Sequence, residues 1–271
     1  MTDPQIWYRG SAPELYEHLL VPLIFSPHAR ILASRLAGVS ADDLLEIAAG
    51  TGALTRELCK VVPATVRIVA SDINQTMLDQ AMTMPDARRV TWRQADAMSL
   101  PFDDRSFDAA VCQFGVMFFP DKVAAYREAL RVLKPGGRFL FSVWDKLETN
   151  VLNQMYQDIL DRMFPSDAPG RMRVPYSYHH TDTIERDLRD AGFSNVGIAV
   201  VTEWYGSMSA REAAYALVQG HSVRVEIEAR GPDYLDKAAE ALDQAVADRF
   251  GKGPVKIPNR AMIVHAERPV S

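Results

Sequence analysis

The chain contains the segment Asp43-Leu44-Leu45-Glu46-Ile47-Ala48-Ala49-Gly50-Thr51-Gly52-Ala53-Leu54-Thr55-Arg56-Glu57-Leu58. The apolar run 44–48 predicts a buried strand, the small residues 49–53 predict a tight turn, and apolar residues at helical spacing over 54–61 predict a helix. Glycine adopts backbone angles closed to other residues, and without a side chain it lets a ligand approach the main chain. The free N–H groups at the helix start then favour a polar or anionic ligand group beside Gly50 and Gly52.

Two carboxylates accompany this turn. Glu46 lies near the end of the first strand, where it can accept a hydrogen bond from a cationic or hydroxyl group. Asp72 ends the next β-rich run, 66–71, and lies 20 residues beyond Gly52, about the interval at which a βαβ unit places an acidic residue against a ribose diol. Asp72 could instead cap the helix that follows, as could Asn74. We favour the ribose interpretation because the glycine turn and the carboxylate agree in spacing.

Strand and helix patterns alternate along the rest of the chain. Further strands are predicted over 89–94, 107–114, 138–144, 195–204 and 261–266. Such alternation indicates an α/β fold, with a mostly parallel, doubly wound sheet and helices on both faces. Ligands of these sheets bind beside the carboxyl ends of the strands. The residues expected at that edge are Glu46, Gly50, Asp72, Asp96 and Gln113.

The chain divides into three predicted parts. Residues 1–40 form a helical arm that we expect to break around Pro22 and Pro27, and residues 41–147 form the cofactor-binding core. Residues 148–271 complete the sheet. Their long insertions, about 148–180 and 205–256, exceed what simple connections need, so we expect a helical substrate cover. Within the second insertion, residues 223–227 alternate and could be a short strand instead of a helix.

Composition limits the classes of partner. Hydrophobic residues make up 48% and charged residues 24% of the chain, as in ordinary globular proteins. A net charge of −5 argues against a nucleic-acid partner, which would require clustered Lys and Arg. Cys59 and Cys112 lack the spacing of a zinc site, and no metal is expected. With no signal peptide and no bilayer-length apolar stretch, we expect a cytoplasmic protein without stable membrane insertion.

The sequence resembles class I S-adenosylmethionine-dependent methyltransferases, and most closely the branch of ubiquinone and menaquinone biosynthesis. The resemblance lies in the segments LLEIAAGTG, VASDINQTML, QADAMSLPFDDRSFDAAVCQFGVMFFPD and ALRVLKPGGRFLFSVW. It implies a Rossmann-like seven-stranded sheet with an antiparallel last strand, and S-adenosyl-L-methionine as cofactor. The cofactor-binding residues that it implies are Glu46, Ala48, Gly50, Thr51, Gly52, Asp72, Ile73, Met77, Asp96, Ala97, Gln113 and Phe114. Ala48 stands where the family often has glycine.

The implied reaction is in-line transfer of a methyl group to a small-molecule acceptor, which chiefly requires alignment and exclusion of water. His179 is the candidate general base, because it precedes a helix of the expected cover. The candidate acceptor pocket comprises Tyr16, Phe25, Phe118, Trp144, Tyr176 and Tyr178. A homodimer is compatible with the sequence. Two other functions remain open: a nicotinamide-dependent oxidoreductase, although Thr55 replaces the third glycine of that motif, and a non-catalytic cofactor-binding partner subunit.

Overall fold

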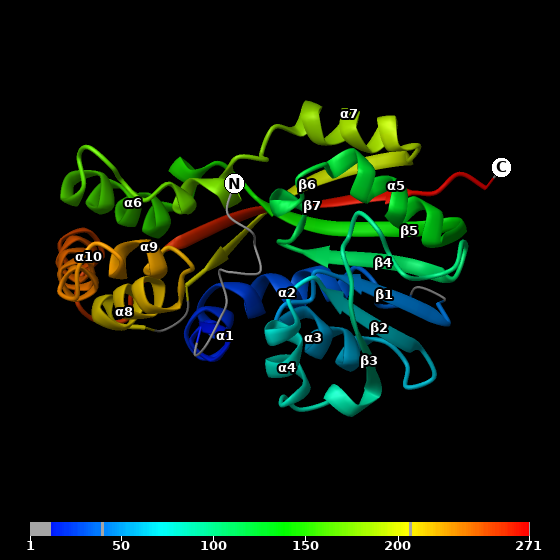
Figure 1. Ribbon diagram of the computed structural model, residues 1–271, viewed down its shortest axis with the longest axis horizontal. Coiled ribbons are helices and arrows are strands. Elements are labelled where there is room, and N and C mark those ends of the chain that lie inside the picture. The colour runs from blue at the N-terminus through cyan, green and yellow to red at the C-terminus, as the bar shows by residue number, and fades with distance from the viewer. Residues whose placement is uncertain (1–11, 39–40, 206–207, 271) are drawn as a thin grey trace.

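The computed structural model describes residues 12–38, 41–205 and 208–270, which form a seven-stranded sheet flanked by helices (Figure 1). The strands are β1 Asp43–Ile47, β2 Arg67–Asp72, β3 Val90–Gln94, β4 Phe107–Gln113, β5 Leu133–Trp144, β6 Ser194–Trp204 and β7 Pro258–Glu267. Their order across the sheet is β3-β2-β1-β4-β5-β7-β6. β7 runs antiparallel to β5 and β6, and all other pairs are parallel. The predicted fold class and its antiparallel last strand are confirmed.

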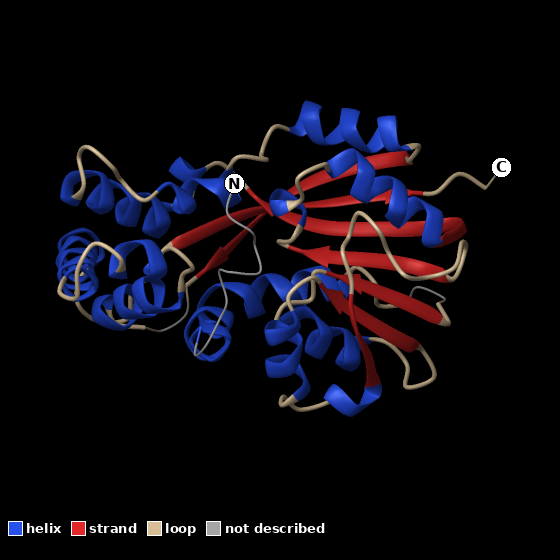
Figure 2. Cartoon of the chain, in the orientation of Figure 1, coloured by secondary structure: helices blue, strands red, loops and turns tan. Residues whose placement is uncertain are grey.

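Helices cover both faces of the sheet (Figure 2). The α-helices of the sheet region are α2 Ser26–Ser34, α3 Ala53–Val61, α4 Gln75–Met82, α5 Lys122–Val132 and α7 Thr181–Ala191. Leu44 and its sheet neighbours Ile68 and Ala109 pack in one core with α2 and α3, whereas Leu45 and Val69 pack in the core that contains α5 and α7. Because successive strand residues point to opposite faces, a sheet buried on both sides needs continuous apolar runs.

The described part of the N-terminal arm is one continuous helical run over 12–34 and does not break at Pro22. A short helix, α1 Ala12–Leu15, passes into a π-helical segment, η2 Tyr16–Phe25, and then into α2. Pro22 lies inside η2, and Pro27 lies in the first turn of α2, where its missing N–H is tolerated. The predicted breaks at these prolines were therefore wrong.

The insertions of the C-terminal part form a helical lobe beside the sheet (Figure 1). The lobe contains α6 Val151–Met163, α8 Ala210–Gly220, α9 Arg224–Glu228 and α10 Tyr234–Phe250. The alternative of a strand over 223–227 is wrong. Val223 and Ile227, four residues apart, are both fully buried, while Val225 between them is 43% exposed. That pattern belongs to one face of a helix.

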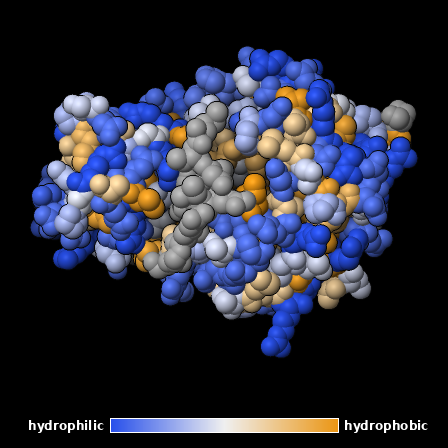
Figure 3. All heavy atoms as spheres, viewed as in Figure 1, coloured by the Kyte–Doolittle hydropathy of each residue, from blue (hydrophilic) through white to orange (hydrophobic). Residues whose placement is uncertain are grey.

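The surface seen in Figure 3 is mostly hydrophilic, with apolar residues in small groups. None of the helices in the described part of the chain is long and apolar enough to span a bilayer.

Candidate functional site

A cavity of about 330 Å³ lies at the carboxyl ends of the central strands. Volumes of this order hold small ligands in proteins. Four strand ends and the arm contribute to its wall. The lining residues are Tyr16, Phe25, Ile47, Ala48, Ala49, Gly50, Thr51, Ala53, Asp72, Ile73, Asn74, Met77, Ala95, Asp96, Ala97, Met98, Gln113, Phe114, Gly115, Phe118, Phe119 and Pro120.

The glycine turn after β1 forms one wall through its backbone. Gly50 and Gly52 have φ values of 56° and 81°, in the left-handed region that glycine adopts without strain. Ala48 also has a φ of 56°, which costs an alanine about 1 kcal/mol or more. A glycine would avoid this cost at position 48. Gly52 ends the turn as the N-cap of α3 and is not part of the cavity wall.

Asp72 is held in place by backbone donors on both of its oxygens. The Gly50 N–H donates to Oδ2 at 2.8 Å, and the Asn74 N–H donates to Oδ1 at 2.8 Å. Asn74 caps α4 by accepting from the Thr76 N–H at 3.0 Å, so the cap alternative for Asp72 does not apply. Burial raises the pKa of Asp72, and these backbone hydrogen bonds oppose the shift. Each carboxylate oxygen can still accept a second hydrogen bond.

A second carboxylate lies across the same polar end of the cavity. Asp96 follows β3, and its Oδ1 accepts from the Met98 N–H at 2.9 Å. The lining also includes the apolar residues Ile73, Met77 and Ala97. Two carboxylates together with apolar side chains suit a ligand that carries polar groups on a flat ring.

Glu46 lies outside the cavity, behind the glycine turn. It is 1% exposed and accepts a hydrogen bond from the Thr55 hydroxyl at 2.6 Å. Burial raises the pKa of Glu46 to about 8, opposed by the hydrogen bond from Thr55 and by the charge of Arg56. Glu46 does not line the cavity. The interpretation that it accepts a hydrogen bond from the ammonium group of the cofactor stays a prediction.

The other end of the cavity is aromatic. Tyr16 and Phe25 reach it from the arm, and Phe114, Phe118 and Phe119 reach it from the segment after β4. The π-helix explains why both arm residues arrive together. Hydrogen bonds that span five residues widen each turn, so residues nine apart return to the same face after about two turns, and the two rings lie 5.0 Å apart.

Four other predicted residues do not line the cavity. Trp144 stacks directly on Phe114, with ring centroids 3.6 Å apart, and so lies behind it. Tyr176 lies a further 6.3 Å beyond Trp144. The hydroxyl of Tyr178 donates to Asp187, and a ring nitrogen of His179 bonds the backbone oxygen of Tyr176. None of the described residues of the helical lobe lines the cavity either. The arm lines it instead, through Tyr16 and Phe25.

Several lining residues were not predicted. Asn74, Met98 and Gly115 each lie within two residues of a predicted site residue, so proximity to the strand ends could have indicated them. A side chain added at Gly115 would come within 2.5 Å of the Ala48 Cβ. That close contact between the ends of two adjacent strands is visible only once they are paired.

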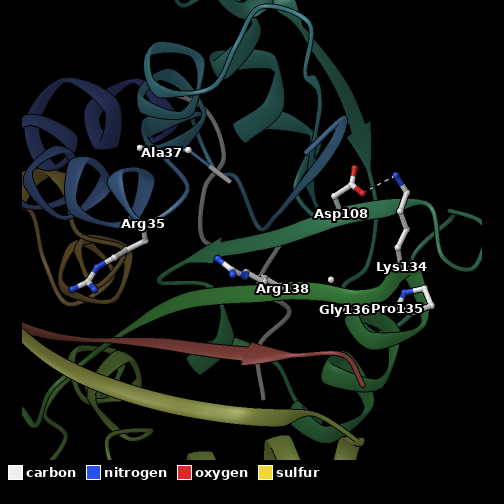
Figure 4. Close-up of a pocket in the computed structure, with 9 residues that line it drawn as sticks. Arg35, Ala37, Asp108, Lys134, Pro135, Gly136 and Arg138 are labelled. Carbon is white, nitrogen blue, oxygen red and sulfur yellow. Dashed lines mark hydrogen bonds and ion pairs between the residues drawn. The ribbon is translucent and has the colours of Figure 1, made fainter. Parts of the chain in front are cut away.

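A larger hollow of about 490 Å³ lies at the opposite edge of the sheet (Figure 4). It is lined by charged residues, among them Arg35, Lys134 and Arg138. Lys134 is paired with Asp108 at 2.8 Å. The hollow lies at the amino ends of β4 and β5, away from the glycine turn. We therefore assign the ligand site to the cavity at the carboxyl ends, where parallel sheets bind ligands.

Comparison with known proteins agrees with this geometry. The model of the ubiE/COQ5 methyltransferase family matches residues 28–206. The ubiquinone/menaquinone biosynthesis C-methyltransferase UbiE of Pseudomonas aeruginosa is 35% identical over 176 residues, which cover 59% of this chain and 69% of that protein.

Solved structures share the fold at lower identity. A putative methyltransferase of Bacillus halodurans is 18% identical with a TM-score of 0.55, covering 89% of this chain and 98% of that one. A phosphoethanolamine N-methyltransferase of Haemonchus contortus, solved with S-adenosyl-L-methionine, is 17% identical with a TM-score of 0.59. The match covers 95% of this chain and 56% of that one. The chain belongs to the ubiE/COQ5 methyltransferase family and is an enzyme that transfers a methyl group from S-adenosyl-L-methionine to a small molecule.

Proposed function

We propose that the cavity holds the nucleoside of S-adenosyl-L-methionine at its polar end and a flat, apolar methyl acceptor at its aromatic end. The observation that supports this most is the division of one continuous wall. Asp72 and Asp96 follow β2 and β3, on one side of β1 in the sheet, and Phe118 follows β4, on the other side. The ring of Phe25 lies 5.8 Å from that of Phe114, which also follows β4, and 5.0 Å from that of Tyr16.

The polar end fits the cofactor. Asp72 is oriented by two backbone N–H groups before any ligand arrives, so its remaining lone pairs are ready for the hydroxyl groups of a ribose. A Cβ added at Gly50 would lie 3.6 Å from Met77 Cε, so the missing side chain leaves room along the wall for the ligand. Thr51 Oγ1 and Asn74 Nδ2 are buried and have no hydrogen-bond partner among the described residues, which leaves polar capacity at this end.

The aromatic end fits an acceptor that needs alignment more than proton transfer. The bound cofactor supplies a methyl group activated by positive sulfur. Among the described lining residues the only titratable side chains are Tyr16, Asp72 and Asp96, and His179 lies elsewhere. The rings exclude water and fix the plane of an acceptor stacked among them. Gln113 keeps the arm in place, since its amide donates to the Phe25 carbonyl at 2.8 Å.

We infer that the acceptor is an electron-rich ring, such as a quinol, and that a ring carbon receives the methyl group. The new C–C bond forms as the bond between the methyl group and sulfur breaks, which leaves S-adenosylhomocysteine, and the proton of that ring carbon is then lost to solvent. The aromatic wall supports a flat apolar ring, and the P. aeruginosa relative bears the name of a quinone-biosynthesis C-methyltransferase. The helical lobe forms a second layer behind the arm rather than the wall itself, because Gly220 of α8 packs against Leu20 of η2.

The test is methyl transfer from labelled S-adenosyl-L-methionine to 1,4-naphthalenediol and 1,4-benzenediol under reducing conditions. We expect label on a ring carbon, identified by NMR of the product. The variant Phe118→Ala should raise the acceptor KM more than it lowers kcat, because it removes acceptor surface and leaves the polar end intact. Binding of S-adenosylhomocysteine without labelling of either diol, or label on oxygen, would overturn the acceptor class.

A further inference from the structure

One arginine side chain connects the cofactor turn to the arm. Arg56 lies in the first turns of α3. Its Nη1 donates to the Thr51 carbonyl at 2.9 Å, and its Nη2 donates to Glu17 Oε1 at 2.6 Å. Thr51 lines the polar end of the cavity, and Glu17 directly follows Tyr16, which lines the aromatic end. The two halves of the site therefore share one guanidinium group, although it does not itself line the cavity.

This ion pair lies mostly in the protein interior. The Glu17 side chain is 5% exposed and that of Arg56 is 18% exposed. Glu17 Oε2 is buried without a hydrogen-bond partner among the described residues. Breaking such a pair leaves an uncompensated buried charge, unlike the loss of an exposed pair, which has little effect. Without Arg56, the Glu17 carboxylate regains solvation only if the arm moves outward.

The arm is held at both ends of its π-helical segment. Glu17, at the start of η2, is bound to Arg56, and the carbonyl of Phe25, at its end, accepts from the Gln113 amide. The two cavity-lining rings, Tyr16 and Phe25, lie at these same ends. The position of the aromatic wall thus depends on contacts made by β4 and by α3, the helix that directly follows the glycine turn.

We propose that Arg56 is a positioning residue that couples order in the cofactor turn to closure of the arm over the acceptor end. This rests on the proposed function, because it takes the turn beside Thr51 to be where the cofactor binds. A ligand that orders the turn fixes the position of the Thr51 carbonyl. The Arg56 guanidinium group donates to this carbonyl and is then fixed as well, and so is Glu17, which accepts from the same group. The arm is then partly ordered before the acceptor binds, so acceptor binding costs less conformational entropy. Each ligand therefore raises the affinity for the other.

Hydrogen exchange of the backbone amides of residues 14–21 and 23–25 of the arm tests this, with S-adenosylhomocysteine as the probe. In the wild-type chain we expect saturating probe to slow their exchange by about tenfold or more. In Arg56→Met the probe should still bind, yet slow arm exchange by less than about threefold. The matched control is Lys60→Met, which removes an exposed ion pair with Glu57 on the same helix and should behave as wild type.

A second variant tests the inference even if Arg56→Met does not fold. Glu17→Gln keeps an oxygen that can accept from Arg56 but removes the charge, and we expect it to lose part of the coupling while folding normally. If Arg56→Met or Glu17→Gln binds the probe and gains as much arm protection as wild type, the inference is overturned. A wild-type chain that does not bind the probe would overturn the proposed function and this inference with it, so the two failures are distinguishable.

Discussion

Two carboxylates next to the glycine turn differ in what surrounds them. Asp72 meets two backbone N–H groups and remains in contact with the cavity, whereas Glu46 meets one hydroxyl and is enclosed. Burial raises the pKa of both carboxyl groups. At Asp72 the backbone N–H groups oppose the shift, and its oxygens remain available to a ligand. Residues of the same chemical type on two adjacent strands therefore have different expected effects when they are replaced.

Replacing Asp72 should weaken cofactor binding. Hydrogen bonds to a charged group contribute about 1.5–3 kcal/mol, so we expect Asp72→Ala to raise the Kd of S-adenosylhomocysteine by about tenfold to a hundredfold. Calorimetric titration measures this directly. Asp79→Ala is the matched control, because Asp79 lies on neighbouring α4, is exposed and accepts a hydrogen bond from the Gln75 amide at 2.8 Å. Unchanged affinity in Asp72→Ala would place the nucleoside elsewhere.

Replacing Glu46 with glutamine should stabilise the protein at alkaline pH. The pKa of Glu46 is raised from 4.5 to about 8 in the folded state, so unfolding releases its proton between these values and stability falls as pH rises through them. Glutamine resembles the protonated acid and can still accept from Thr55. Urea unfolding should show Glu46→Gln close to wild type near pH 4.5 and more stable than wild type at pH 8. Equal pH dependence in both would contradict the shift.

At the scale of elements, the strands were predictable and the arm was not. Every predicted strand is present because a sheet covered on both faces requires uninterrupted apolar runs, as over 44–48. The prediction that the arm breaks rested on Pro22, because a proline inside a helix usually breaks it. The π-helical segment of the arm packs against α3 and α8. Those contacts are distant in sequence, so no local pattern indicated that Tyr16 and Phe25 would share a face.

The contact between α8 and the arm gives a prediction for Gly220. A Cβ at this position would lie 2.6 Å from Leu20 Cγ, and Leu20 is 2% exposed. Overpacking of this kind costs about 1–3 kcal/mol, which exceeds the gain of alanine over glycine in a helix. We expect Gly220→Ala to lower the free energy of unfolding in urea. Gly170→Ala is the control, since nothing lies within 4 Å of its added Cβ, and a similar loss there would show a backbone effect instead.

At the scale of the whole molecule, the sequence located the polar half of the site better than the aromatic half. Asp72, Asp96 and Gln113 follow directly from strand ends, so topology alone brings them to one edge. Trp144 also ends a strand, but the ring of Phe114 stacks over it and separates it from the cavity. His179 precedes α7, which packs against α5 and β6 rather than at the ligand edge. Which side chain lies in front of another is decided by tertiary packing. Family membership, in turn, decides between methyl transfer and the nicotinamide alternative.

Buried histidines and a buried glutamate together set how the stability of the whole chain depends on pH. Burial lowers the pKa of His28 and of His221 from 6.5 to about 4, the first opposed by a hydrogen bond with Asn259 and the second reinforced by Arg171. Each histidine takes up a proton on unfolding between these values, so stability falls as pH drops from about 6.5 to 4. Glu46 acts with the opposite sign between 4.5 and 8, and the raised pKa of Asp72 adds to it.

These contributions predict a stability maximum near pH 6.5. Below it the two histidines outweigh Glu46, and above it the opposite contribution of Glu46 continues, so the free energy of unfolding should decline toward pH 8. Each group accounts for about 1.4 kcal/mol per pH unit within its window. His28→Gln and His221→Gln should each flatten the acid side, because one proton-binding site is removed, while the alkaline side keeps its slope. Urea unfolding across pH 4.5–8 at fixed ionic strength measures both slopes, and a wild-type stability that keeps rising from pH 6.5 to 8 would refute the assignment.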